Sequence, residues 1–167
     1  MNISEALKKR GVSVLHKIFE MVKTGQKADI SELESYVADM VAEVASGKPE
    51  GQLVLLNSGD DSDYAVVHSV NVAFLSIIFA LRFKTKTDEL HDIALGALLH
   101  DIGKIGMPDE IIKKPSKLSE EEFLIVKNHP VIGAKIIKEI DSLAAIVPII
   151  LHHHERFDGK GYPDKLK

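Results

Sequence analysis

Apolar residues recur at helical spacing through most of the chain, and this periodicity constrains the fold more than any other feature of the sequence. In the first segment they begin at Leu7 and end at Val22, on one helical face. Similar segments begin near residues 31, 64, 87, 119, 130 and 142. No alternating apolar–polar run of useful length occurs, so no strand is expected. The sequence therefore predicts an all-α fold.

Capping residues suggest where several of these helices begin and end. Ser31 with Glu34, and Ser119 with Glu122, have the spacing of a capping box. Each serine is therefore expected to start a helix. Gly25 is expected to close the first helix, because glycine commonly follows a helix C-terminus.

Proline residues predict two interruptions. The pair His129-Pro130 should separate two helices, because the residue before proline avoids helical geometry. Pro148 should kink a last helix over residues 142–153. Between the helices, residues 102–118 are expected to form a loop that contains glycine, proline and several lysines.

Composition narrows the function classes. The chain has 167 residues, a formal net charge of −4 and no cysteine. The negative charge argues against binding to a nucleic acid polymer through a general basic surface, and the lack of cysteine excludes disulfides and thiolate zinc sites. Residues 64–81 are apolar but contain histidine, asparagine and serine, which indicates a core helix and no membrane span. No signal peptide is recognised at the N-terminus, and a cytoplasmic location is expected.

The domain boundary is expected near residues 47–60. Residues 1–55 would form a short N-terminal helical extension, and residues 56–167 a second domain. The extension could regulate or dimerise the protein, so a homodimer is left open. The simpler interpretation, which we favour, is that its amphipathic helices pack on the core and lengthen it.

Histidine and aspartate residues occur in a fixed order along the predicted helices. His68 lies in an apolar segment, His100-Asp101 ends another, and later motifs contain His129, His153 and His154. Imidazole and carboxylate groups hold non-thiolate metal centres. Taken alone, His68 would be a satisfied core histidine and His129 a surface loop residue. Their occurrence together favours a metal site.

The order H…HD…H…HHE…DGxGYP resembles the HD-GYP family, bacterial phosphodiesterases within the HD phosphohydrolase superfamily. The resemblance covers residues 63–163, with HSVNVA, HDIGKIGMPDEI, HPVIGAKII and HHERFDGKGYP as its stretches. Residues 1–55 show no such match. The resemblance implies an HD-domain-like helical bundle that acts on cyclic di-GMP in signal transduction.

The resemblance also implies roles for individual residues. Asp101 would bridge two divalent metal ions, iron or manganese, and would act in catalysis together with Lys104, which would also meet a substrate phosphate. A third metal is not expected, because Tyr64 replaces the glutamate that some members carry one turn before the first histidine. The implied metal ligands are His68, His100, Asp101, His129, His153 and His154.

The loop at the end of the motif is implied to bind the substrate or partner domains of the GGDEF type, with Tyr162 as an exposed recognition residue. The adjacent His152 is expected to be a bystander or to support the ligands, because three consecutive helical residues cannot face one centre. Besides Lys104, the implied binding residues are Asp158, Gly159, Gly161, Tyr162 and Pro163.

The resemblance predicts a phosphodiesterase that hydrolyses cyclic di-GMP to the linear dinucleotide or GMP. Two alternatives remain: a degenerate or incomplete module for nucleotide sensing or partner docking, and a hydrolase for another nucleotide. Family members continue beyond GYP into a helix with a further aspartate ligand, whereas this sequence ends at Lys167. Asp164 is too close to the turn to replace that aspartate, so we expect the ligand set within these residues to be incomplete.

Overall fold

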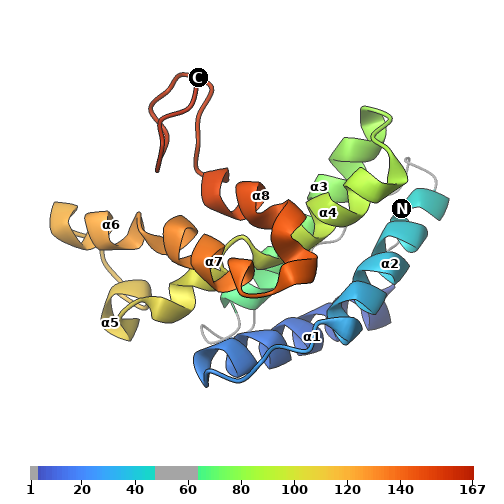
Figure 1. The fold of residues 1–167 in the computed structure, drawn as a ribbon, viewed down its shortest axis with the longest axis horizontal. Coiled ribbons are helices and arrows are strands. Elements are labelled where there is room, and N and C mark those ends of the chain that lie inside the picture. The colour runs from blue at the N-terminus through green and yellow to red at the C-terminus, as the bar shows by residue number, and fades with distance from the viewer. Residues whose placement is uncertain (1–3, 48–63) are drawn as a thin grey trace. The chain divides into compact units, whose positions relative to one another are not determined.

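The structure is a computed structural model that describes residues 4–47 and 64–167 (Figure 1). Within these residues the chain forms helices joined by turns and contains no strand, which confirms the all-α prediction. The chain divides into two compact units, Met1–Leu98 and Leu99–Lys167, which are described separately below. The predicted boundary between residues 55 and 56 lies outside the described residues.

The first unit is built from amphipathic helices whose apolar faces bury one another. Its helices α1, α2 and α3 contact each other in all three pairs. The largest fully buried side chains include Leu15, Tyr36 and Phe74. The bounds of the helices are α1 Glu5–Lys23, α2 Ser31–Ser46, α3 Tyr64–Arg82 and α4 Thr87–Leu99, whose last residue belongs to the second unit.

Helix α3 is the most apolar element of the first unit. Its length and composition would allow it to cross a membrane, with a mean hydropathy of 1.9, but 44% of that window is buried inside the protein. Val70, Phe74 and Ile77 on this helix are fully enclosed. This burial, together with the contacts to α1 and α2, agrees with the predicted core helix.

The ends of the first two helices test the capping predictions. Gly25 follows the C-cap of α1 with a φ of +68°, so it closes the helix as predicted. The predicted capping box at Ser31 and Glu34 is wrong. Ile30 occupies the N-cap position, and the Ser31 amide donates to Asp29 Oδ1 at 3.0 Å. Asp29 therefore satisfies a donor at the start of α2, and Ser31 is already helical.

The second unit is organised around α7. This helix contacts the 3-10 helices η2 and η3 and the helix α8 (Figure 1). The predicted loop over residues 102–118 is partly wrong, because it contains η2 and the single-turn helix α5. The bounds are η2 Ile102–Gly106, α5 Asp109–Ile112, α6 Glu120–Val126, α7 His129–Lys138, η3 Asp141–Ile146 and α8 Val147–His152.

The two proline predictions have different outcomes. A break does occur before α7, because α6 ends at Val126, but His129 is itself the first helical residue, with Pro130 in the first turn. The predicted kinked helix over residues 142–153 is wrong. A 3-10 helix ends at Ile146, and α8 begins as a separate helix with Pro148 in its first turn. Proline is tolerated there because amide groups in the first turn of a helix have no acceptor within the helix, so the lack of an N–H breaks no hydrogen bond.

The predicted capping box of α6 is confirmed. The Ser119 side chain accepts from the Glu122 amide at 3.2 Å, and the Glu122 carboxylate accepts from the Ser119 amide at 2.7 Å. We expect Ser119→Ala to lower the free energy of unfolding by about 1 kcal/mol, because one N-terminal amide of a short helix loses its acceptor. Urea unfolding measures this loss. The exposed Ser116→Ala provides the control, and equal stability of the two variants would contradict the prediction.

Candidate metal centre

The His100-Asp101 pair lies between α4 and η2, directly after the last helical residue, Leu99. Both residues are buried, with 8% and 3% of their surfaces exposed. A buried carboxylate is unfavourable unless charges and hydrogen bonds compensate for its lost hydration. The groups around Asp101 therefore decide what this position can do.

The two oxygens of the Asp101 carboxylate face different partners. Oδ2 lies 2.7 Å from Lys104 Nζ and 3.2 Å from His100 Nε2, whereas Oδ1 lies 3.3 Å from His129 Nε2 and 4.0 Å from His153 Nε2. Burial by itself would raise the pKa of this carboxyl. The hydrogen bonds from His100 and His129 and the charge of Lys104 outweigh it and hold the pKa well below the usual range. Asp101 therefore stays ionised at neutral pH.

The rings of His129 and His153 are oriented by backbone carbonyls. His129 Nδ1 lies 2.7 Å from the Val126 oxygen, and His153 Nδ1 lies 2.8 Å from the Ile150 oxygen. A carbonyl only accepts, so each Nδ1 carries a proton, which leaves Nε2 as the ring atom that can coordinate a metal ion. The two Nε2 atoms are 3.0 Å apart. This spacing brings two nitrogens that can coordinate a metal ion close to each other and to Asp101 Oδ1.

His154 adds a third imidazole to this group. The ligand atoms of His129, His153 and His154 all lie within 4.8 Å of one another. Burial lowers the pKa of His153 to about 3 and also lowers the pKa of His154. Both rings are therefore neutral at pH 7, which is the form that binds a metal ion. These imidazoles and the Asp101 carboxylate could hold a metal.

The structure thus brings five of the six predicted ligands together within the second unit. The remaining residue, His68, belongs to the first unit. It is half-buried on α3, where its ring stacks on Tyr64 one turn earlier, with ring centroids 6.0 Å apart. Tyr64 is 62% exposed and occupies the position where the family resemblance places a third-metal glutamate.

The glycine-rich loop after α8 folds back on the histidines. At Gly161 a Cβ would lie against backbone atoms, 2.5 Å from Glu155 Cα and 2.6 Å from the His154 oxygen, so only glycine fits there. The Tyr162 amide donates to the same His154 oxygen at 3.3 Å. The Tyr162 ring stacks on the His154 ring, with centroids 4.6 Å apart and planes 20° apart. Tyr162 is therefore half-buried, whereas the sequence predicted an exposed residue.

The other predicted loop residues stabilise the turn. Asp158 accepts from Arg156 at 2.8 and 3.0 Å and from the Lys160 amide at 3.1 Å. Gly159 has a φ of +70°, a conformation that favours glycine. Pro163 is half-buried beside Tyr162.

Glu155, which had no predicted role, and His152, which was expected to be a bystander or to support the ligands, hold the segment after Pro163. The Glu155 carboxylate accepts hydrogen bonds from the backbone amides of residues 164, 165 and 166, with N···O distances of 2.6, 2.9 and 3.1 Å. His152 Nε2 lies 2.9 Å from Asp164 Oδ2. His152 is the last residue of α8 and does not belong to the groups of described residues that could hold a metal ion, and through Asp164 it supports the turn. Glu155 belongs to the HHE motif and His152 directly precedes it, but the sequence spacing did not reveal which groups these two residues contact.

We expect Glu155→Gln to loosen this segment and leave the metal content unchanged. A neutral amide is a weaker acceptor than a carboxylate, and it offers only one oxygen to three amides. Amide hydrogen exchange at residues 164–166 should be faster by roughly tenfold, which corresponds to about 1.4 kcal/mol. The exposed Glu139→Gln serves as control. Unchanged exchange in Glu155→Gln would show that the carboxylate does not hold the segment.

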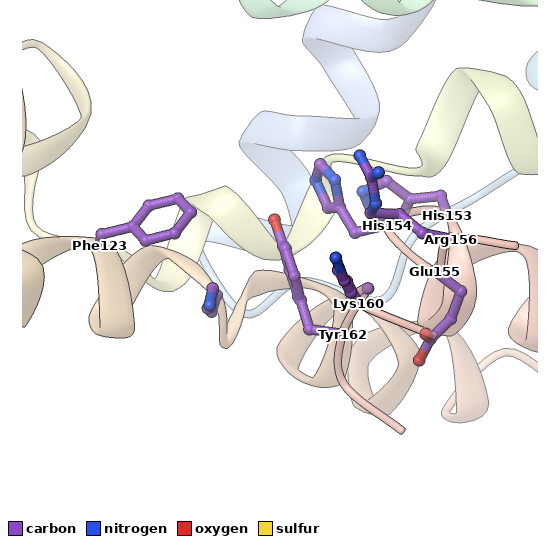
Figure 2. Close-up of a pocket in the computed structure, with 9 residues that line it drawn as sticks. Phe123, His153, His154, Glu155, Arg156, Lys160 and Tyr162 are labelled. Carbon is purple, nitrogen blue, oxygen red and sulfur yellow. The ribbon is translucent and has the colours of Figure 1, made fainter. Parts of the chain in front are cut away.

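A cavity of about 410 Å³ opens beside the predicted metal ligands His153 and His154 (Figure 2). Sequence reasoning identified the histidines and Tyr162 but missed Phe123 and Lys127, which lie one helical turn apart at the end of α6. Lys104 does not line this cavity and instead pairs with Asp101. The lining residues are Phe123, Lys127, His153, His154, Glu155, Arg156, Lys160, Gly161 and Tyr162.

Comparison with known proteins gives several relatives. A cyclic di-GMP phosphodiesterase of Pseudomonas aeruginosa is 35% identical over 155 residues, which are 92% of this chain and 37% of the relative. A cyclic di-GMP phosphodiesterase of Thermotoga maritima is 44% identical over 102 residues, 60% of this chain and 28% of the relative. A 3'3'-cGAMP-specific phosphodiesterase of Vibrio cholerae is 30% identical over 142 residues, 85% of this chain and 30% of the relative.

The chain therefore spans 37% or less of the length of these relatives. A family model described as the HD domain matches residues 60–167, which is more than half of the chain. The matched region contains each of the motifs on which the HD-GYP resemblance rests, and the relatives confirm that resemblance. This chain belongs to the HD domain family.

Proposed function

We propose that this chain is the hydrolytic part of a metal-dependent phosphodiesterase that cleaves cyclic di-GMP. The observation that carries the proposal is the convergence of His129 Nε2 and His153 Nε2 on each other and on one oxygen of Asp101. This arrangement places two imidazole nitrogens and a carboxylate oxygen where one cation could contact all three. The relatives from Pseudomonas aeruginosa and Thermotoga maritima, both named cyclic di-GMP phosphodiesterases, support the choice of substrate.

The donor set fits two divalent ions, for which we propose iron or manganese. Imidazole nitrogens and a carboxylate, with no thiolate, suit either metal. Asp101 would contribute one oxygen to each side, because its two oxygens already face different histidines. His100 would serve the side of Oδ2, with His68 as its proposed companion, and the other three histidines would serve the side of Oδ1. The chemistry that such ions supply is the activation of water for attack at phosphorus and the stabilisation of negative charge.

The protein prepares this site in two ways, one through backbone carbonyls and one through the side chain of Lys104. The backbone carbonyls fix the imidazole tautomers before any ligand binds, which reduces the cost of ordering the site. Lys104 holds a positive charge 2.7 Å from Asp101 Oδ2, and its side chain is 32% exposed. A phosphate oxygen that approaches this edge would meet the ammonium group, which agrees with the predicted role of Lys104.

We also propose a cytoplasmic location, and we propose that the loop of residues 158–163 contacts GGDEF-type domains. The loop offers the exposed charged residues Asp158 and Lys160 to a partner. A second candidate substrate is 3'3'-cGAMP, because the Vibrio cholerae relative is named for it. The two nucleotides differ only in one purine base.

The test is an anaerobic incubation of the purified chain with iron(II) or manganese(II) and each cyclic dinucleotide, followed by chromatography of the products. We expect the linear dinucleotide or GMP to form from cyclic di-GMP. Asp101→Asn is the negative control for contaminating activity. A folded protein that retains metal but yields no product would contradict the proposal, and preferred cleavage of 3'3'-cGAMP would favour the second substrate.

A further inference from the structure

Lys127 occupies an unusual position for a lysine. Its ammonium nitrogen lies 4.8 Å from the centroid of the Phe123 ring and 5.4 Å from the centroid of the Tyr162 ring. The two aromatic residues come from α6 and from the glycine-rich loop, so the cation joins distant parts of the second unit. Such cation–π contacts orient an ammonium group without neutralising its charge.

The charge of Lys127 has no carboxylate partner among the residues that the structure describes. Two other cations near the centre differ in this respect, because Lys104 pairs with Asp101 and Arg156 pairs with Asp158, whereas Lys160 on the cavity wall shares the lack of such a partner among the described residues. Lys127 lines the cavity and is only partly exposed. A positive charge that two rings hold at a cavity wall can attract an electronegative group of a ligand.

The same cavity reaches the proposed metal ligands. Figure 2 shows Phe123 and His154 on opposite sides of Tyr162. The stacked pair of His154 and Tyr162 therefore connects the metal centre with the aromatic end of the cavity. A nucleotide with its phosphate near His154 would extend its base toward Phe123 and Lys127.

We propose that Phe123, Lys127 and Tyr162 form a base-binding site that selects guanine over adenine. The aromatic rings offer apolar faces on which a purine stacks. Guanine presents two acceptors, O6 and N7, on one edge, whereas adenine presents the N7 acceptor beside the N6 donor. An ammonium group can donate to both guanine atoms, but it opposes the amino group of adenine. This proposal rests on the proposed function for its substrate class, but it concerns binding alone.

The test measures equilibrium binding by calorimetry with the whole chain, after a chelator has removed metal so that no hydrolysis occurs. The ligands are cyclic di-GMP and cyclic di-AMP. We expect the protein to bind cyclic di-GMP more tightly by on the order of tenfold, the preference that one good contact to a base edge gives. Lys127→Met should abolish the preference by weakening cyclic di-GMP alone. Phe123→Leu should weaken both ligands, because it removes a stacking surface that either purine can use.

Lys138→Met is the matched control, because Lys138 is an exposed lysine at the end of α7 that does not line the cavity. An equal loss of affinity for both nucleotides in Lys127→Met would overturn the proposal and would indicate that Lys127 contacts a phosphate group. Absence of binding, or of any preference in the unchanged protein, would also overturn it. The proposed function fails separately: a metal-loaded protein that binds with the expected preference but releases no product refutes hydrolysis and leaves the base site intact.

Discussion

Asp101→Asn is expected to remove metal from the purified protein and to lower the rate of cyclic di-GMP hydrolysis by more than about a hundredfold. Mutation of a residue that only hydrogen-bonds to a metal ligand already lowers activity by up to about a hundredfold, and loss of a ligand itself should cost more. The amide has nearly the shape of the carboxylate but lacks its charge, and only one of its two positions is an oxygen. It could therefore not serve both sides of the centre. Elemental analysis of metal per chain and chromatography of the products measure the two effects.

The metal-free variant should also be less stable. Asp101 is buried and compensates the charge of Lys104, and removal of one partner from a buried pair costs about 3–5 kcal/mol. The loss here should be smaller, because the Lys104 side chain is 32% exposed and water can stabilise its charge. Asp109→Asn is the control, since that exposed carboxylate also pairs with a lysine, Lys113. Full metal content in Asp101→Asn would show that Asp101 is not a ligand.

Apolar periodicity predicted the helices well because burial decides most of their faces, as at Leu33, Tyr36 and Met40 on α2. Helix ends were less predictable. Ser31 and Ser119 begin the same four-residue pattern, but only Ser119 forms a capping box. Residue spacing does not reveal that Asp29, two residues earlier, already accepts the Ser31 amide.

The order of the motifs predicted which ligands would gather in the second unit, but not how their rings would point. The ring orientations depend on carbonyls three residues before His129 and His153, which become available only where α6 ends and α8 turns. The contact of Lys127 with two aromatic rings was not predictable either. It requires the end of α6 and the loop of Tyr162 to meet in space, and no spacing in the sequence encodes that meeting.

Gly103→Ala is expected to damage both the fold and the metal centre. A Cβ at this position would collide with the His129 carbonyl oxygen and would lie 2.5 Å from the Gly133 nitrogen. Both are backbone atoms of α7, so no change of rotamer relieves the contact, and η2 must move away from α7. We expect the free energy of unfolding to fall by about 3 kcal/mol, the upper end of the usual cost of over-packing. Urea unfolding of the metal-free protein measures this change.

The movement should reach the metal centre because Asp101 directly precedes η2 and His129 begins α7. If η2 shifts, the distance between the Asp101 carboxylate and the His129 ring grows, and metal affinity should fall even in protein that remains folded. Gly106→Ala lies in the same 3-10 helix but would meet only the Ile132 side chain, at 3.3 Å, which can rotate. That variant should retain metal. If both variants kept equal stability and metal content, the close approach of η2 and α7 would not be what sets the spacing of Asp101 and His129.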